Sequence, residues 1–204
     1  MKKALPLLAL CFALLLSSFI LRPTADGYKV GDKAADFKLK NTNGKMVSLA
    51  DNPTAKGYIV VFTCNTCPYA KAYEIRVIDL NTKYAPLGYS VVAINPNDAA
   101  TVPGDSYAAM QTKKYAFPYL QDESQQVAKT YGATRTPHLF VLTRQGQSSD
   151  FVVSYIGAID DNSEDPKLVK TKYVENAMTE ILAGKSATIN STKAIGCTIK
   201  WKRA

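Results

Sequence analysis

Short hydrophobic runs and turn residues divide the first part of the chain into predicted strands. Residues 58–62 form a continuous β-branched and aromatic run, typical of a strand buried on both faces of a sheet. Residues 37–39 and 46–49 instead alternate in polarity on either side of Asn43-Gly44, which is a hairpin signal. The pattern therefore predicts a β-hairpin followed by a buried strand.

A helix with one apolar stripe is predicted next. Tyr73, Val77, Leu80 and Tyr84 recur at spacings of four, three and four residues, which places them on one helical face. Pro68 suits the first turn of this helix, where a missing N–H costs nothing. Pro86 and Gly88 then predict its end.

The rest of the chain alternates between strand-like and helix-like segments. Strands are predicted at residues 89–94, 117–120, 139–143 and 151–156, and helices at 106–115, at 125–131 and from Asp165-Pro166 to just before Gly184. Strands that alternate with helices and finish in a hairpin and a helix predict an α/β fold. Its centre is expected to be a mixed β-sheet flanked by helices.

The ends of the chain differ from this pattern. Lys2 and Lys3 precede an apolar run over residues 4–21, so residues 1–25 are interpreted as a signal peptide or an N-terminal membrane anchor. Residues 28–184 are then one domain, and residues 185–204 are a C-terminal tail. In that tail, hydrophobic residues at alternate positions predict a short strand-like segment laid on the domain. They are Ile195, Cys197, Ile199 and Trp201.

Composition and charge narrow the class of protein. The chain has 204 residues, of which 47% are hydrophobic and 21% charged, as in an ordinary globular protein. The formal net charge of +8 is spread along the chain and comes with no nucleic-acid-binding motif. We therefore expect a solvated basic surface and no nucleic-acid partner. The membrane is expected to be a partner only through the N-terminal segment, if that segment is not cleaved.

The cysteines provide the candidate chemistry. Export places thiols in an oxidising environment, and three cysteines follow the leader: Cys64, Cys67 and Cys197. Cys64 and Cys67 lie between the predicted buried strand and the predicted helix, as a dithiol redox centre requires. The helix N-terminus is expected to favour the thiolate of Cys64. Cys67, one turn into the helix, is expected to be more buried and to attack a mixed disulfide formed on Cys64.

Two other interpretations of a Cys-x-x-Cys pair are less favoured. A structural zinc site needs a second Cys/His pair at zinc spacing, which the sequence lacks. An inert structural disulfide is a second alternative, although a loop this short is a poor stabiliser. Dithiol exchange is therefore the preferred interpretation.

The sequence also resembles a known superfamily. Residues 62–68, Phe-Thr-Cys-Asn-Thr-Cys-Pro, resemble the thioredoxin active-site turn, and Thr136-Pro137 resembles the cis-proline loop that faces it. Residues 31–39, with Gly44 and Leu49, resemble the opening of redoxin domains. These include the TlpA/ResA-like proteins and the alkyl hydroperoxide reductase/thiol-specific antioxidant group, whose peroxiredoxin-like branch the chain is similar to. The resemblance covers roughly residues 28–183.

The resemblance implies a thioredoxin-like fold with an N-terminal hairpin extension, and it implies a role for each site residue. Cys64 is the attacking nucleophile, Cys67 resolves, and Thr136 and Pro137 position the partner peptide. The implied activity is an extracytoplasmic thiol–disulfide oxidoreductase, in the periplasm or on the outer face of a bacterial membrane. It needs no cofactor beyond its redox-active disulfide. Its partners are protein thiols or disulfides and an unidentified redox partner.

Two alternative functions remain open from the sequence. Peroxiredoxins require a Pro-x-x-x-Thr/Ser-x-x-Cys pattern that neither Cys64 nor Cys67 has, and Arg135 has no evident claim to their activating arginine, which leaves at most a weak thiol peroxidase. Copper chaperones of the Sco type share the thioredoxin frame and bind through two cysteines and a histidine. Cys64, Cys67 and His138, the sole histidine, are such a Cu(I) ligand set, although here the cysteines are one residue closer than is usual.

Cys197 has two interpretations as well. It is either a tail residue with no chemistry or a third redox thiol that folds back and resolves an oxidised Cys64. Its position relative to the Cys64–Cys67 pair decides between them.

Overall fold

The computed structural model describes residues 27–146 and 148–203. The segment interpreted as a signal peptide or membrane anchor, residues 1–25, lies outside that part of the chain. Within it, none of the helices has both the length and the apolar character that a membrane span requires.

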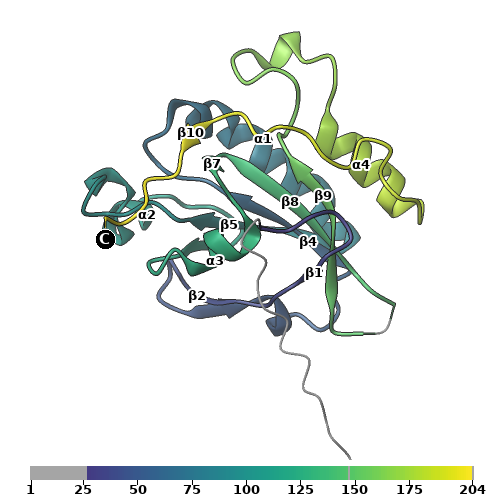
Figure 1. Ribbon diagram of the computed structural model, residues 1–204, viewed down its shortest axis with the longest axis horizontal. Coiled ribbons are helices and arrows are strands. Elements are labelled where there is room, and N and C mark those ends of the chain that lie inside the picture. The colour runs from purple at the N-terminus through teal and green to yellow at the C-terminus, as the bar shows by residue number, and fades with distance from the viewer. Residues whose placement is uncertain (1–26, 147, 204) are drawn as a thin grey trace, which may run out of the picture.

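The core of the protein is an eight-stranded mixed sheet (Figure 1). Its strands follow the spatial order β1-β9-β8-β4-β5-β6-β2-β3. Strand β4 pairs in parallel with β5, β5 pairs in parallel with β6, and the remaining pairs are antiparallel. The strands are β1 (Lys33–Ala34), β2 (Lys38–Asn41), β3 (Met46–Ser48), β4 (Gly57–Phe62), β5 (Tyr89–Asn95), β6 (Tyr119–Gln121), β8 (His138–Arg144) and β9 (Phe151–Gly157).

Strand β4 lies at the centre of the sheet and is buried on both faces, as its apolar run predicts. Ile59 and Val61 pack into the hydrophobic cluster on the α1 side. Val60 and Phe62 pack into a second cluster on the opposite face. Because β4 has hydrogen-bonded neighbours on both edges and side chains buried on both faces, the loop that follows it starts from a fixed point.

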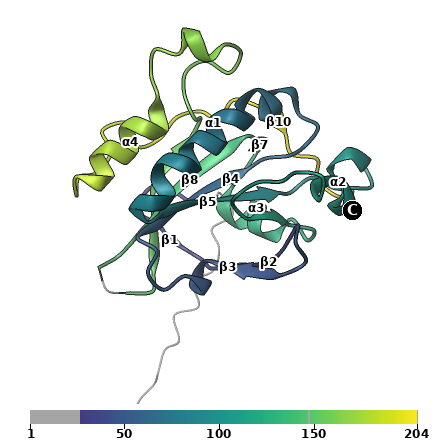
Figure 2. The same ribbon diagram turned by 180° about the vertical axis from the view of Figure 1, so that it is seen from behind.

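Helices cover both faces of this sheet. Figure 2 shows α1 in front of the sheet, whereas Figure 1 shows α3 in front. The side chains of α4 join the cluster beneath α1, and those of α3 join the opposite cluster. The helices are α1 (Pro68–Tyr84), α2 (Tyr107–Met110), α3 (Gln126–Tyr131) and α4 (Tyr173–Leu182). The mixed sheet flanked by helices confirms the predicted α/β class.

Helix α1 has the predicted apolar stripe. Tyr73, Val77, Leu80 and Tyr84 are all buried, and Pro68 occupies the first helical position. The helix passes into a short 3-10 turn, after which Gly88 adopts a φ of 94°. Such a left-handed conformation costs glycine little, so Gly88 lets the chain reverse directly into β5.

The hairpin predicted around Asn43-Gly44 is formed by β2 and β3. Two predicted helices, however, are shorter than the sequence pattern indicates. Helix α2 ends at Met110 rather than near residue 115, and the Thr112 hydroxyl donates to the Ala109 carbonyl oxygen that a continuing helix would use.

The last helix begins at Tyr173 and not at Asp165-Pro166. Asp165 caps only a 3-10 turn, by accepting a hydrogen bond from the Lys167 N–H. The carboxylate of Asp161 then accepts the N–H groups of Lys170 and Thr171, which holds this stretch out of helical geometry. A side chain distant from the predicted cap therefore decides where α4 starts.

The C-terminal tail lies on the domain, as the alternation of its hydrophobic residues predicts. It crosses from α4 toward α2 in Figure 1 and forms a separate two-stranded sheet on the way. That sheet pairs β10 (Cys197–Thr198) with β7 (Arg135–Thr136) in antiparallel register. Ile199 is buried in the same cluster as Val60 and Phe62, so the tail is part of the folded core.

Candidate redox site

The two cysteines of the pair lie in a turn between β4 and α1. The Thr63 N–H donates to the Ile94 carbonyl oxygen and keeps the chain beside β5 for one residue beyond β4. Cys64 is outside the helix, and Cys67 is the N-cap residue immediately before Pro68. The prediction that Cys67 lies one turn into the helix is therefore wrong. Pro68 has no N–H to donate and fixes the first helical residue there, which leaves Cys67 in extended geometry.

A buried carboxylate holds this turn in place. Asp105 is 1% exposed and accepts hydrogen bonds from the backbone N–H groups of Asn65 (2.8 Å) and Thr66 (3.1 Å). It also accepts the Thr66 hydroxyl (2.8 Å) and the Asn97 side-chain amide (2.7 Å). Four donors on one carboxylate compensate its burial and fix the two residues between the cysteines.

Asn65 connects the turn to two further segments. Its side-chain NH2 group donates to the Gly104 carbonyl oxygen (3.0 Å), and its side-chain oxygen accepts the Tyr119 hydroxyl (3.0 Å). Asp105, Gly104 and Tyr119 carry no motif that links them to a cysteine pair in sequence. None of the three is predicted from sequence, and Pro103-Gly104 indicates only a loop.

Thr136 contacts both cysteines, and the Thr136-Pro137 peptide bond is cis. The Thr136 hydroxyl oxygen lies 3.3 Å from Cys64 Sγ, within hydrogen-bond distance. Cys67 Sγ lies 3.1 Å from the Thr136 carbonyl oxygen, to which it donates in its thiol form. The structure therefore brings together Cys64, Cys67, Thr136 and Pro137, the four residues that the resemblance implies.

Replacing Thr136 with valine is expected to shift the redox equilibrium of the pair. Valine keeps the shape and the main-chain acceptor for Cys67 but removes the hydroxyl beside Cys64 Sγ, a contact that lowers the pKa of Cys64 and so stabilises the reduced, ionised pair. Loss of about 1 kcal/mol from the reduced form makes the reduction potential more negative by about 20 mV. A glutathione redox titration read by maleimide labelling measures this shift. Thr134→Val, at an exposed position two residues away, is the control and is expected to leave the potential unchanged.

The two thiols titrate as a pair. The hydrogen bond from Cys64, aided by the Cys197 thiol, lowers the pKa of Cys67 to about 4. The same contact with Cys67, followed by burial and the nearby Asp105 charge, raises the pKa of Cys64. The pair thus loses one proton readily and retains the second, because two adjacent thiolates would repel each other. The single negative charge is therefore shared by the two sulfur atoms, and the placement of the thiolate on Cys64 stays a prediction from sequence position.

Accessibility separates the two sulfur atoms only slightly. Cys64 is 6% exposed and Cys67 is 4% exposed. Cys64 and Pro137 line a cavity of about 10 Å³, together with Tyr73, Glu74 and Tyr115. This is about the space of one water molecule, so the cavity admits no larger ligand without movement. Cys67 does not line it.

The tail places Cys197 beside Cys67. Cys197 pairs with Thr136 in the β10–β7 ladder and packs against the small buried cluster of Cys64, Cys67 and Ala70. Cys67 is the neighbouring thiol that, after burial, raises the pKa of Cys197. Of the two interpretations of Cys197, the one as a third redox thiol paired it with Cys64, whereas the structure makes Cys67 its neighbour.

His138 is not brought to the thiols. Its ring packs against Phe140, with ring centroids 4.7 Å apart, and its Nδ1 accepts the Thr134 N–H (3.4 Å). Phe140 belongs to the cluster on the face opposite to α1. Within residues 27–146 and 148–203, no three His, Cys, Asp or Glu side chains are grouped so as to hold a metal ion. The structure therefore does not support the alternative Cu(I) ligand set of Cys64, Cys67 and His138.

Arg135 is also committed elsewhere. Its guanidinium donates to the Gly196 carbonyl oxygen (2.8 Å), which joins it to the tail. It is thus a contact of the tail, and Arg135 does not serve as the activating arginine of a thiol peroxidase.

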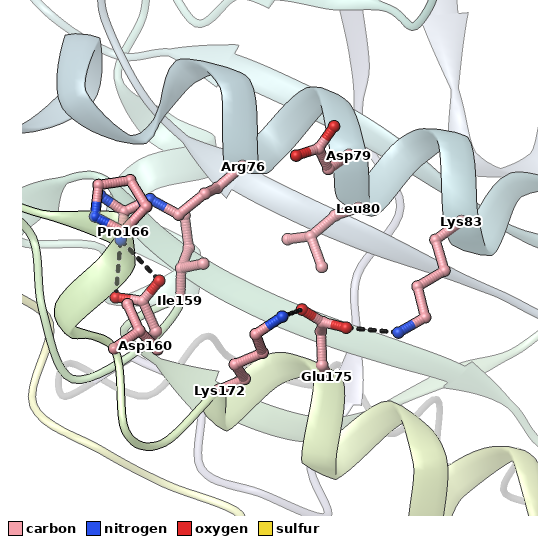
Figure 3. Close-up of a pocket in the computed structure, with 10 residues that line it drawn as sticks. Arg76, Asp79, Leu80, Lys83, Ile159, Asp160, Pro166, Lys172 and Glu175 are labelled. Carbon is pink, nitrogen blue, oxygen red and sulfur yellow. Dashed lines mark hydrogen bonds and ion pairs between the residues drawn. The ribbon is translucent and has the colours of Figure 1, made fainter.

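A larger cavity of about 300 Å³ lies between α1 and the segment that leads into α4 (Figure 3). Apart from Asp79, its charged side chains are paired with one another. Arg76 contacts the buried Asp160 at 2.6 Å, and Glu175 pairs with both Lys83 and Lys172. These pairs attach the segment to α1, so we interpret the cavity as structural.

The fold and the site together define a class. A mixed sheet flanked by helices, with a cysteine pair before the first long helix and a Thr–cis-Pro loop against it, is a thioredoxin-like domain. A model of the AhpC/TSA family matches residues 30–155, more than half of the chain, and the protein belongs to that family. Membership in this thiol-redox family supports a redox function in general.

Two solved structures align over most of both chains. An uncharacterized conserved protein from Geobacillus kaustophilus is 34% identical, with a TM-score of 0.78; the match covers 87% of this chain and 94% of that one. A hypothetical protein from Sinorhizobium meliloti 1021 is 33% identical, with a TM-score of 0.79 and coverage of 87% and 97%. Among curated proteins, none matches the sequence.

Proposed function

We propose that the protein is an extracytoplasmic thiol–disulfide oxidoreductase that exchanges a Cys64–Cys67 dithiol and disulfide with protein partners. The observation that carries the proposal is the placement of the two cysteines. Both are buried in the turn before α1, and the sulfur atoms of both contact Thr136. A dithiol that ionises easily to a single thiolate is poised for exchange.

Cys64 is the proposed attacking nucleophile, because it lines the small cavity beside Pro137 and Cys67 does not. Its thiolate attacks one sulfur of a partner disulfide, and the other partner sulfur leaves as a thiolate. Cys67 then attacks Cys64 Sγ and releases the second partner sulfur. The Cys64–Cys67 disulfide forms, the partner disulfide is reduced by two electrons, and the two thiol protons pass to the partner.

The extracytoplasmic location rests on the N-terminal sequence, with Lys2 and Lys3 followed by an apolar run. The proposed location is the periplasm or the outer face of a bacterial membrane, and the membrane is contacted only through this segment. The proposed partners are proteins with thiols or disulfides, since no cofactor is needed for the exchange.

Insulin reduction by the full chain, with dithiothreitol as the electron donor, tests the proposal. We expect Cys64→Ser to abolish turnover. We expect Cys67→Ser to stop after one step, as a mixed disulfide with insulin that mass spectrometry detects. Cys11→Ser removes a thiol from the leader instead and is the control, with turnover like that of the unaltered protein. Turnover by Cys64→Ser at the unaltered rate would refute the proposed function.

A further inference from the structure

We propose that Cys197 is a third redox thiol, which moves the disulfide from Cys64–Cys67 to Cys67–Cys197 and so carries the oxidising equivalent to the tail. This rests on the proposed function, because that function supplies the Cys64–Cys67 disulfide. The starting observation is that three thiols form one cluster: Cys197 packs against Cys64, Cys67 and Ala70, and it pairs with Thr136, which contacts both other cysteines.

The backbone around Cys197 is built for a close approach to the site. Gly196 lies so near the Thr136-Pro137 peptide that an added Cβ would be 2.2 Å from the Thr136 carbonyl oxygen. No side chain fits at that distance, so glycine allows the tail to reach the cysteines. The Arg135 guanidinium binds the Gly196 carbonyl oxygen, and the Ile199 N–H donates to the Thr134 carbonyl oxygen.

The tail is anchored on both sides of Cys197. Before it, the Thr192 N–H donates to the Ile156 carbonyl oxygen, and the Thr192 hydroxyl accepts the Ala158 N–H. After it, the buried Gln125 amide donates to the Lys200 carbonyl oxygen and accepts the Lys202 N–H. Moving the tail off the domain would break these hydrogen bonds together. Passing the disulfide on to Cys197 leaves the tail in place, so none of these hydrogen bonds has to break.

Exposure indicates what the transfer achieves. Cys64 and Cys67 are both buried, whereas Cys197 is partly exposed. A disulfide between the buried Cys64 and Cys67 is reached by a protein reductant less readily than one that includes the tail. The same oxidising equivalent held as Cys67–Cys197 includes one partly exposed residue. A dithiol protein can then attack Cys197, release Cys67 and take up the disulfide itself.

The exchange is balanced within the chain. The Cys197 thiolate attacks Cys67 Sγ, the Cys67–Cys197 bond forms and the Cys64–Cys67 bond breaks. The electron pair stays on Cys64, which takes the proton that Cys197 gave up. No external oxidant or reductant is consumed.

Oxidation of the pair also prepares Cys197 for this attack. In the reduced site, burial, followed by the hydrogen bond to Cys67 and the Cys67 charge, raises the pKa of Cys197 to about 11. When Cys67 is bonded to Cys64 it has neither that charge nor a proton to share. Both of those effects then disappear, and the nearby Lys200, which lowers the pKa of Cys197, remains. Cys197 is thus more easily ionised when there is a disulfide to attack.

Disulfide mapping of the full chain tests the inference. Cys64→Ser is oxidised with diamide, digested and analysed by mass spectrometry, and the expected product is a peptide linked through Cys67 and Cys197. In the Cys64→Ser background, Gly196→Ala keeps every remaining thiol but pushes the tail away, so a loss of the linkage is expected. Thr198→Ala, at the exposed neighbouring position, is the matched control and is expected to retain it. A linkage that does not form in Cys64→Ser, or that Gly196→Ala leaves intact, would overturn the proposal.

A second experiment distinguishes this inference from the proposed function. The unaltered chain is equilibrated in glutathione redox buffers, and its disulfide-linked peptides are identified by mass spectrometry. Peptides linked through Cys64–Cys67 and through Cys67–Cys197 are both expected. A dithiol protein should reduce the oxidised Cys197→Ser variant more slowly than it reduces the oxidised unaltered chain. Insulin turnover with only the Cys64–Cys67 peptide would reject the role of Cys197 and leave the proposed function standing. If no Cys64–Cys67 disulfide forms at any potential, the proposed function itself fails.

Discussion

Replacing Asp105 with alanine is expected to lower the free energy of unfolding by about 3 kcal/mol and to reduce thiol exchange sharply. The substitution removes the acceptor of the partly buried N–H groups of Asn65 and Thr66 and of the buried Asn97 amide. Each unpaired buried donor costs about 1–3 kcal/mol, and the loss of buried charge offsets part of the total. Urea denaturation gives the stability, and the insulin assay gives the exchange.

The conservative variant separates the structural and electrostatic effects of Asp105. Asp105→Asn keeps the shape and removes the negative charge that contributes to the raised pKa of Cys64. The reduced, ionised pair is then stabilised, so the reduction potential should become less negative. Asp98→Ala removes an exposed carboxylate from the same loop and serves as the control. If Asp98→Ala destabilises the protein as much as Asp105→Ala does, the role assigned to the buried Asp105 carboxylate is contradicted.

The stability of the protein is expected to fall as the pH drops from about 6.5 to 4, by about 3 kcal/mol from His138 alone. Burial, reinforced by the Arg135 charge, lowers the pKa of His138 from 6.5 to about 4. Between these values the unfolded chain binds a proton on His138 and the folded protein does not, so acid favours unfolding. Above pH 6.5 both forms are neutral, and below pH 4 the loss is complete.

Urea denaturation at a series of pH values measures this effect, and His138→Asn provides the control. The asparagine side chain can still accept the Thr134 N–H but does not titrate in this range. The difference in stability between the two proteins should change between pH 6.5 and 4 and stay constant above it. Because other acidic groups titrate alike in both proteins, their contributions cancel. A constant difference over the whole range would show that His138 remains free to protonate in the folded state.

The elements that the sequence predicts well are those whose structure depends on their own local pattern of hydrophobic residues. The apolar run at residues 58–62 is buried on both faces wherever it lies, and the stripe of α1 from Tyr73 to Tyr84 needs only one covering surface. The cysteine turn follows from these two elements, since the chain leaves the end of one and enters the start of the other. The placement of Thr136 and Pro137 came from resemblance and was not contained in local pattern.

The features that the sequence does not predict depend on contacts between distant residues. The Asp161 carboxylate delays α4 until Tyr173, although Asp165-Pro166 has the form of a helix start. Asp105 serves the cysteine turn through three hydrogen bonds, yet it lies in a short 3-10 turn that carries no recognisable motif. The partner of Cys197 depended on the register of two residues against β7, and a single alternating pattern cannot fix such a register.

The pairing of β10 with β7 has a consequence for the order in which the site is assembled. Strand β10 follows every other described strand and helix in the sequence, so a growing chain carries Cys64 and Cys67 long before Cys197 has been made. During that interval the pair has no cover, and its two thiols meet any oxidant directly. A nascent or truncated chain is therefore a two-cysteine protein with an open site, and only the finished tail converts it into a covered one with three thiols. A bulky fusion that holds the tail away from β7 would recreate that early state in the mature protein.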